Sequence, residues 1–153
     1  MNVNKKYTIR LALFLALSMV TFMIVGKLTI VATDSINANV LWVTDDTPKK
    51  GDYVNYTLDP NVVDNKNITV TKKVVCVEGD RLVNKGPRFY CNGQAIGTAK
   101  AKGRKKQVLK QFVWDGEIPK GMFFLSGEHK DSFDSKYWGF ALVGKTTKVI
   151  KIL

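Results

Sequence analysis

The chain is 153 residues long, which is the size of one ordinary domain. Its composition, 45% hydrophobic and 24% charged, excludes a disordered or collagen-like chain. Lys and Arg outnumber Asp and Glu by 24 to 13, so the net charge is +11 and contact with an anionic membrane or nucleic acid is favoured. Two cysteines and one histidine cannot form a zinc site by themselves, and no metal or cofactor is expected.

The N-terminal segment contains an uncharged run of 16 residues, Leu11 to Gly26, between Arg10 and Lys27. As a helix this run is roughly 24 Å long, shorter than the roughly 30 Å hydrocarbon core of a bilayer. Because Arg10 and Lys27 can extend their charges to the head groups, the segment from Tyr7 to Ile30 is long enough to span. The sequence therefore predicts one N-terminal transmembrane helix.

The basic residues before this segment predict a cytoplasmic N-terminus and an exported remainder, as in a single-pass membrane protein. A cleaved signal peptide is the alternative. Neither Val31-Ala32-Thr33 nor Asn37-Ala38-Asn39 is a good Ala-x-Ala cleavage signal, which favours an uncleaved anchor. We therefore divide the chain into residues 1–32, the cytoplasmic N-terminus and anchor, and residues 33–153, the exported domain. The sequence gives no indication of an oligomeric state.

The exported part is basic, because four of the basic residues and none of the acidic ones lie in the anchor region, which leaves 20 against 13 and a net charge of +7. Six basic residues lie between Lys100 and Lys110. This run is either a solvated loop or a contact with anionic lipid head groups worth about 1 kcal/mol per nearby charge, and the two interpretations are compatible. We expect inner-membrane lipid as the anionic partner and no nucleic acid, which an exported domain rarely meets.

Segments rich in β-forming residues follow the anchor, separated by turn sequences. Asn92-Gly93, the strongest two-residue hairpin signal, separates two of them. No long amphipathic helix follows the anchor, so the predicted fold is mainly β, with a coiled antiparallel or barrel-like sheet. The expected strands are 40–43, 53–58, 68–77, 88–91, 94–96, 122–125, 141–143 and 148–150.

Three features of the exported part suggest chemistry in combination. Ser35 lies just after the anchor, Lys72 and Lys73 lie in the longest β-rich segment, and Gly127–Gly139 is rich in Gly, Ser and Asp. Taken singly, each has a structural explanation, since strand lysines are usually solvated and Gly-rich polar segments are usually turns. Their combination and their order along the chain favour a functional interpretation.

Over nearly its whole length the chain resembles the serine–lysine signal peptidase family. In that family a nucleophilic Ser follows a transmembrane helix, and a Gly-Asp pair matched by Gly51-Asp52 lies downstream. The strand pattern Lys-Arg-Val-x-x-x-x-Gly-Asp is matched by Lys72–Asp80, and the apolar strand after Pro-x-Gly by Ile118–Leu125. The last box, Gly-Asp-…-Ser-x-Asp-Ser-Arg-Tyr-x-Gly, is matched by Gly127–Gly139. The small size and the short last box look most like the conjugative-transfer (TraF-type) branch.

The resemblance implies a catalytic pair. Ser35 is expected to be the nucleophile and Lys72 the general base, which requires an uncharged amine. Burial among apolar neighbours on the strand would lower the pKa of this lysine. Because Lys73 points to the opposite face of the strand, only one of the two lysines can face Ser35, and the match to the family selects Lys72.

The resemblance also implies supporting residues. The Thr33 hydroxyl is expected to complete an oxyanion hole with the backbone N–H of the nucleophile. Ser132 is expected to orient the lysine, and Asp134 and Lys136 to pair with each other and brace the site. The family usually has Asp at the position of Glu128 and Arg at the position of Lys136.

The function predicted from this resemblance is a membrane-bound serine endopeptidase that removes leader peptides from exported precursor proteins, with a conjugative pilin precursor as substrate and pilin cyclisation as an alternative outcome to hydrolysis. The contrasting hypothesis is a catalytically inactive, membrane-anchored scaffold of a pilus or type IV secretion apparatus. Cys76 and Cys91 both lie on expected strands in an oxidising compartment. Either they form a disulfide or Cys76 packs as a small buried apolar residue, and both alternatives stay open at this point.

Overall fold

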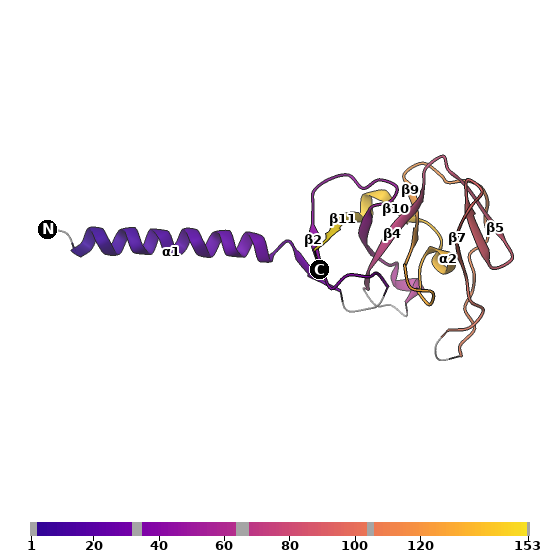
Figure 1. Cartoon of the computed structure of the whole chain (residues 1–153), viewed down its shortest axis with the longest axis horizontal. Helices are drawn as coiled ribbons and strands as arrows, with labels where there is room; N and C mark the ends of the chain where they lie inside the picture. The colour runs from indigo at the N-terminus through magenta and orange to yellow at the C-terminus, as the bar shows by residue number, and fades with distance from the viewer. Residues whose placement is uncertain (1–2, 32–34, 64–67, 104–105, 153) are drawn as a thin grey trace.

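The computed structural model describes residues 3–31, 35–63, 68–103 and 106–152. Within these ranges it contains one long N-terminal helix followed by a β-rich domain from which the helix projects (Figure 1). The elements are α1 (Val3–Val25), β1 (Leu28–Ile30), β2 (Val40–Val43), β3 (Tyr53–Thr57), η1 (Pro60–Val62), β4 (Thr69–Val77), β5 (Arg81–Lys85), β6 (Arg88–Cys91), β7 (Gln94–Thr98), β8 (Asp115–Glu117), β9 (Met122–Ser126), α2 (Ser135–Trp138), β10 (Ala141–Leu142), η2 (Val143–Lys145) and β11 (Thr146–Lys151).

Helix α1 is long and apolar enough over Lys5–Val25 to cross a membrane, and none of that stretch is buried against the domain. The helix ends five residues before the expected end of the span at Ile30. The amide of Gly26 closes the last turn on the carbonyl of Phe22, and the chain then enters strand β1, which pairs with β2. The sequence pattern did not identify this strand, because its apolar residues continue the apolar composition of the helix.

The strands form two antiparallel sheets, one of seven strands in the order β1-β2-β11-β3-β4-β9-β10 and one of four in the order β7-β6-β5-β8. The larger sheet is curled into a half-barrel, so the predicted mainly β, coiled architecture is confirmed. The hairpin at Asn92-Gly93 is also confirmed, with φ of 49° and 81° at the two turn residues, as a type I′ turn requires. Strands β1, β5 and β8 and the short helix α2 were not expected from the sequence.

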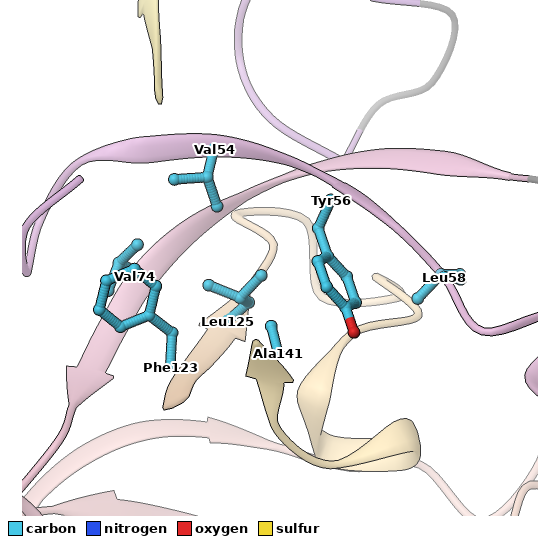
Figure 2. Close-up of a cluster of buried hydrophobic side chains, with 7 residues drawn as sticks. All are labelled: Val54, Tyr56, Leu58, Val74, Phe123, Leu125 and Ala141. Atoms are coloured by element: carbon cyan, nitrogen blue, oxygen red, sulfur yellow. The ribbon is translucent and has the colours of Figure 1, made fainter. Parts of the chain in front are cut away.

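The concave face of the larger sheet holds an apolar cluster (Figure 2). Its buried members come from the neighbouring strands β3, β4, β9 and β10 and from the residue that follows β3. They are Val54, Tyr56, Leu58, Val74, Phe123, Leu125 and Ala141. Because side chains alternate along a strand, Lys72 and Val74 of β4 are buried on the same face. The register with β9 shifts between Val74 and Cys76, and Cys76 packs in a different cluster. Lys72 is therefore a charged residue on the face of β4 that packs this core.

A second apolar cluster joins the two sheets. Phe124 of β9 stacks on Phe89 of β6, with ring centroids 5.5 Å apart. A disulfide links Cys76 of β4 to Cys91 of β6, with 5.9 Å between their Cα atoms. This bridge fixes the smaller sheet to the strand that carries Lys72.

Candidate active site

The segment that carries Ser35, the expected nucleophile, lies between β1 and β2, and we call residues 35–39 the nucleophile loop. Its position is fixed by Ile36, which is 3% exposed and packs with Leu41 and Val149 in a third apolar cluster. The Ser35 carbonyl accepts a hydrogen bond of 2.8 Å from the backbone N–H of Glu128. Apolar packing after the serine and this hydrogen bond hold the loop against the segment that follows β9.

Lys72 is the largest fully buried side chain among the described residues, with 1% of its surface exposed. It lies opposite Val54 of β3, and both neighbours on its face of β4 are apolar. Lys73 is half-exposed and pairs in register with Tyr53 on one side and Ser126 on the other. The alternation of β4 therefore turns one lysine into the core and leaves the other near solvent.

Burial lowers the pKa of Lys72 from its ordinary value of 10.5 to about 8. The negative charge of Asp134 acts in the opposite direction and raises this pKa, while the positive charge of Lys136 lowers it further. No ion pair to Lys72 occurs within the part of the chain that the structure describes. A substantial fraction of these amines is therefore uncharged at mildly alkaline pH, which is the state a proton acceptor needs.

The nucleophile loop and Ser132 both lie against Gly127, the residue that directly follows β9. The last pair of the β4–β9 ladder is Lys73 with Ser126, and Gly127 is the next residue after it. A Cβ atom on this glycine would lie 2.0 Å from the Ser132 Oγ and 3.0 Å from the Ser35 carbonyl oxygen. The close approach needs a residue without a side chain, and it places two hydroxyl-bearing residues, Ser35 and Ser132, at the end of β9.

A buried ion pair lies behind this cluster. The Asp134 carboxylate accepts a 2.6 Å hydrogen bond from the Lys136 ammonium, and both residues are at least 95% buried. The same carboxylate accepts from the Gly127 amide at 3.0 Å, and the Lys136 ammonium also contacts the Ser126 hydroxyl at 3.2 Å. Strand β7 covers the pair, because a Cβ on Gly97 would lie only 3.3 Å from the Lys136 Nζ. The ion pair therefore ties helix α2 to the end of β9.

The structure thus gathers five of the residues singled out in the sequence around the end of β9, whereas Thr33 lies outside the described residues. The five are Ser35, Lys72, Ser132, Asp134 and Lys136. The Ser132 hydroxyl is buried and makes no hydrogen bond within the described ranges, so its expected contact with Lys72 is not formed. Sequence reasoning noted Glu128 only as a departure from the family pattern and missed its bonds to the nucleophile loop. Its place directly after Gly127 was the available signal.

The described residues contain one group of possible metal ligands, Cys76, Asp80 and Cys91, whose ligand atoms lie within 4.8 Å of one another. The two cysteines form the disulfide, so neither offers a thiolate to a metal. The group is also held by other contacts, since the Asp80 carboxylate pairs with Lys50 at 2.7 Å.

Comparison with known proteins identifies the family to which the chain is similar. The model of the family described as signal peptidase, peptidase S26, matches residues 4–150. No curated protein sequence matches the chain. Among solved structures, the chain is similar to a signal peptidase I from Enterococcus faecalis, with 21% sequence identity and a TM-score of 0.42, over 72% of this chain and 99% of that one.

Proposed function

Because the chain belongs to the peptidase S26 signal peptidase family, we propose that it is a membrane-anchored serine endopeptidase in which Ser35 is the nucleophile and Lys72 the general base. The observation that carries this proposal is the burial of Lys72 without an ion pair in the described ranges, which lowers its pKa to about 8. A buried lysine lowers the stability of a fold, so a buried lysine whose pKa is about 8 is best explained by a catalytic role.

The proposed reaction has two steps. The neutral amine of Lys72 takes the proton of the Ser35 hydroxyl as its oxygen attacks the scissile carbonyl, and an oxyanion forms. The carbon–nitrogen bond then breaks, the Lys72 ammonium returns the proton to the leaving amine, and an ester joins the leader to Ser35. Water activated by the same amine hydrolyses this ester. For cyclisation the cut would instead lie near the C-terminus of the pilin, so that the pilin itself is esterified to Ser35 and its own N-terminal amine attacks the ester and closes the ring.

The supporting groups act on charge and position. The Ser35 N–H and the Thr33 hydroxyl would stabilise the oxyanion. Ser132, whose hydroxyl is buried without a partner among the described residues, is free to hydrogen bond to the Lys72 amine when substrate orders the site. Asp134 and Lys136 would hold helix α2 and Gly127 in place without taking part in the proton transfer.

The proposed substrate is the precursor of an exported protein, specifically a conjugative pilin precursor, and the proposed location is a bacterial inner membrane with residues 33–153 in the periplasm and residues 1–32 as cytoplasmic N-terminus and anchor. The apolar helix α1 supports anchoring. The exposed basic residues described between positions 100 and 110 support contact with anionic lipid at the membrane surface.

Co-expression with a candidate pilin precursor tests the proposal. Intact-mass spectrometry is expected to show loss of the leader with the native chain and full-length precursor with Ser35→Ala, although both proteins fold and insert equally. A product lighter by one water than the linear chain of the same residues would identify cyclisation. Equal processing with Ser35→Ala would remove Ser35 from the mechanism, and absence of processing across a panel of precursors would favour the scaffold hypothesis.

A further inference from the structure

Glu128 binds the nucleophile loop with both its backbone and its side chain. Its backbone N–H donates to the Ser35 carbonyl at 2.8 Å, and its carboxylate accepts from the backbone N–H of Asn37 at 2.7 Å. The carboxylate also accepts a hydrogen bond from the Tyr53 hydroxyl. The Lys151 ammonium donates to both carboxylate oxygens, at 3.0 Å to Oε1 and 2.8 Å to Oε2. One residue therefore holds the backbone at Ser35 and two residues later.

We propose that Glu128 is a positioning residue that fixes the nucleophile loop by connecting it to strands β3 and β11, an inference that rests on the proposed role of Ser35 as nucleophile. Strand β3 contributes Tyr53 and strand β11 contributes Lys151. The Lys151 ammonium lies 4.1 Å from the centroid of the Tyr53 ring, so the two partners of the carboxylate also hold each other. The loop is thereby anchored to two neighbouring strands of the larger sheet.

The Glu128 carboxylate is ionised at neutral and alkaline pH. Burial acts to raise the pKa of Glu128, but the hydrogen bonds from the Asn37 amide, Lys151 and Tyr53 outweigh it and hold this pKa at about 2. A charged acceptor makes stronger hydrogen bonds than a neutral one. The contacts with the loop consequently do not change with pH between pH 6 and 10.

Loss of the Glu128 carboxylate should slow catalysis because it would displace the Ser35 hydroxyl. A nucleophile displaced by about 1 Å can lose on the order of 10²-fold in rate. Loss of the carboxylate leaves the bond from the residue 128 amide to Ser35 intact but frees Asn37 and the following chain. We therefore expect Glu128→Ala to lower kcat by about 10- to 100-fold and to change KM by less than about 3-fold.

The matched control is a second lysine of β11. Lys148 forms an ion pair with Asp52 at 3.1 Å and is about as exposed as Lys151, but Asp52 is not bonded to the nucleophile loop. The test uses the full chain in detergent micelles and an internally quenched peptide with Ala-Leu-Ala before the cut. Lys151→Met is expected to lower kcat about 10-fold, Lys151→Arg to restore most of it, and Lys148→Met to leave kcat within 2-fold.

Two further measurements separate positioning from other roles. The pH at half-maximal kcat should be the same in Glu128→Ala and the native chain, because a positioning residue leaves the titration of Lys72 unchanged. Hydrogen exchange of a peptide covering residues 35–43, read by mass spectrometry, should accelerate in Glu128→Ala and not in Lys148→Met. This measurement needs no activity, so it stands even if the proposed function fails.

The outcomes are distinct. Unchanged exchange of residues 35–43 in Glu128→Ala would overturn the inference, as would a kcat within 2-fold of the native value or an equal loss in Lys148→Met. A native chain that is no more active than Ser35→Ala would overturn the proposed function instead. Faster exchange together with a fall in kcat at constant KM supports Glu128 as the positioning residue.

Discussion

Replacement of Lys72 by Met should remove activity and make the stability of the domain respond differently to alkaline pH. In the unfolded chain Lys72 titrates at its ordinary pKa of 10.5, and in the folded chain at about 8. Between these values the folded state holds fewer protons than the unfolded state, so native stability rises with pH. The full difference of about 2.5 pKa units corresponds to about 3 kcal/mol, of which about 2 kcal/mol should develop between pH 7 and 9.5.

The assay is thermal unfolding of the detergent-solubilised full chain, followed by tryptophan fluorescence at several pH values. Lys72→Met lacks this titration and avoids the cost of burying an ammonium, so it should be the more stable protein at pH 7. From pH 7 to 9.5 the Tm of the native chain should rise by roughly 6 °C relative to the Tm of Lys72→Met. Taking the difference between the two proteins cancels the titration of the other lysines and tyrosines. A difference in Tm that is constant over this range would refute a depressed pKa at Lys72, and with it the argument for a lysine base.

Three other predictions follow from the geometry. Lys73→Met should retain at least half of the native activity in the peptide assay, because this side chain lies on the half-exposed face of β4; a dead Lys73→Met with an active Lys72→Met would reverse the assignment. His129→Ala should likewise keep most of the activity, since the described contact of the imidazole is a local turn bond of 3.1 Å to a backbone amide, and a pH profile that changes shape would contradict this. The Cys76–Cys91 bridge closes a loop of 15 residues, so its reduction should lower the free energy of unfolding by roughly 3 kcal/mol on the chain-entropy model. Turnover at room temperature should change little. Two free thiols in protein from the cell envelope would contradict the bridge.

Most strands could be predicted because their side chains alternate or their turns have specific residues. The segment 88–98 folds as a hairpin around Asn92-Gly93, as its turn residues require. Strand β8 at Asp115–Glu117 could not be predicted, because Asp, Gly and Glu have low β-propensity and the strand forms only by pairing with β5. Strand β5 likewise has a single fully buried side chain, Leu82, and gives little periodic signal.

Part of the candidate site could be predicted from the sequence and part could not. Alternation along β4 was sufficient to put Lys72 and Lys73 on opposite faces, and the resemblance identified which of the two to choose. The contacts of Glu128 could not be predicted, since its partners Asn37 and Tyr53 lie 91 and 75 residues away in the chain. Contacts of that kind depend on the register of several strands at once, which sequence patterns do not specify.

The charges at the site explain how Lys72 keeps a lowered pKa, as the proposed base needs, although a buried carboxylate acts on it. Asp134 is the one buried carboxylate among the described residues, and Lys72 and Lys136 are both buried near it. Lys136 binds this carboxylate directly at 2.6 Å. Asp134 therefore attracts the Lys72 ammonium only at longer range, and repulsion by the Lys136 charge opposes this attraction. Burial then decides the pKa of Lys72. Lys136→Met would remove the repulsion and free the carboxylate, and both changes raise the pKa of Lys72. The alkaline rise of kcat should therefore move to higher pH in Lys136→Met and stay in place in Lys136→Arg, measured with the quenched peptide from pH 6 to 10. A rise that stays in place or moves to lower pH in Lys136→Met would show that the ion pair does not control the charge state of Lys72.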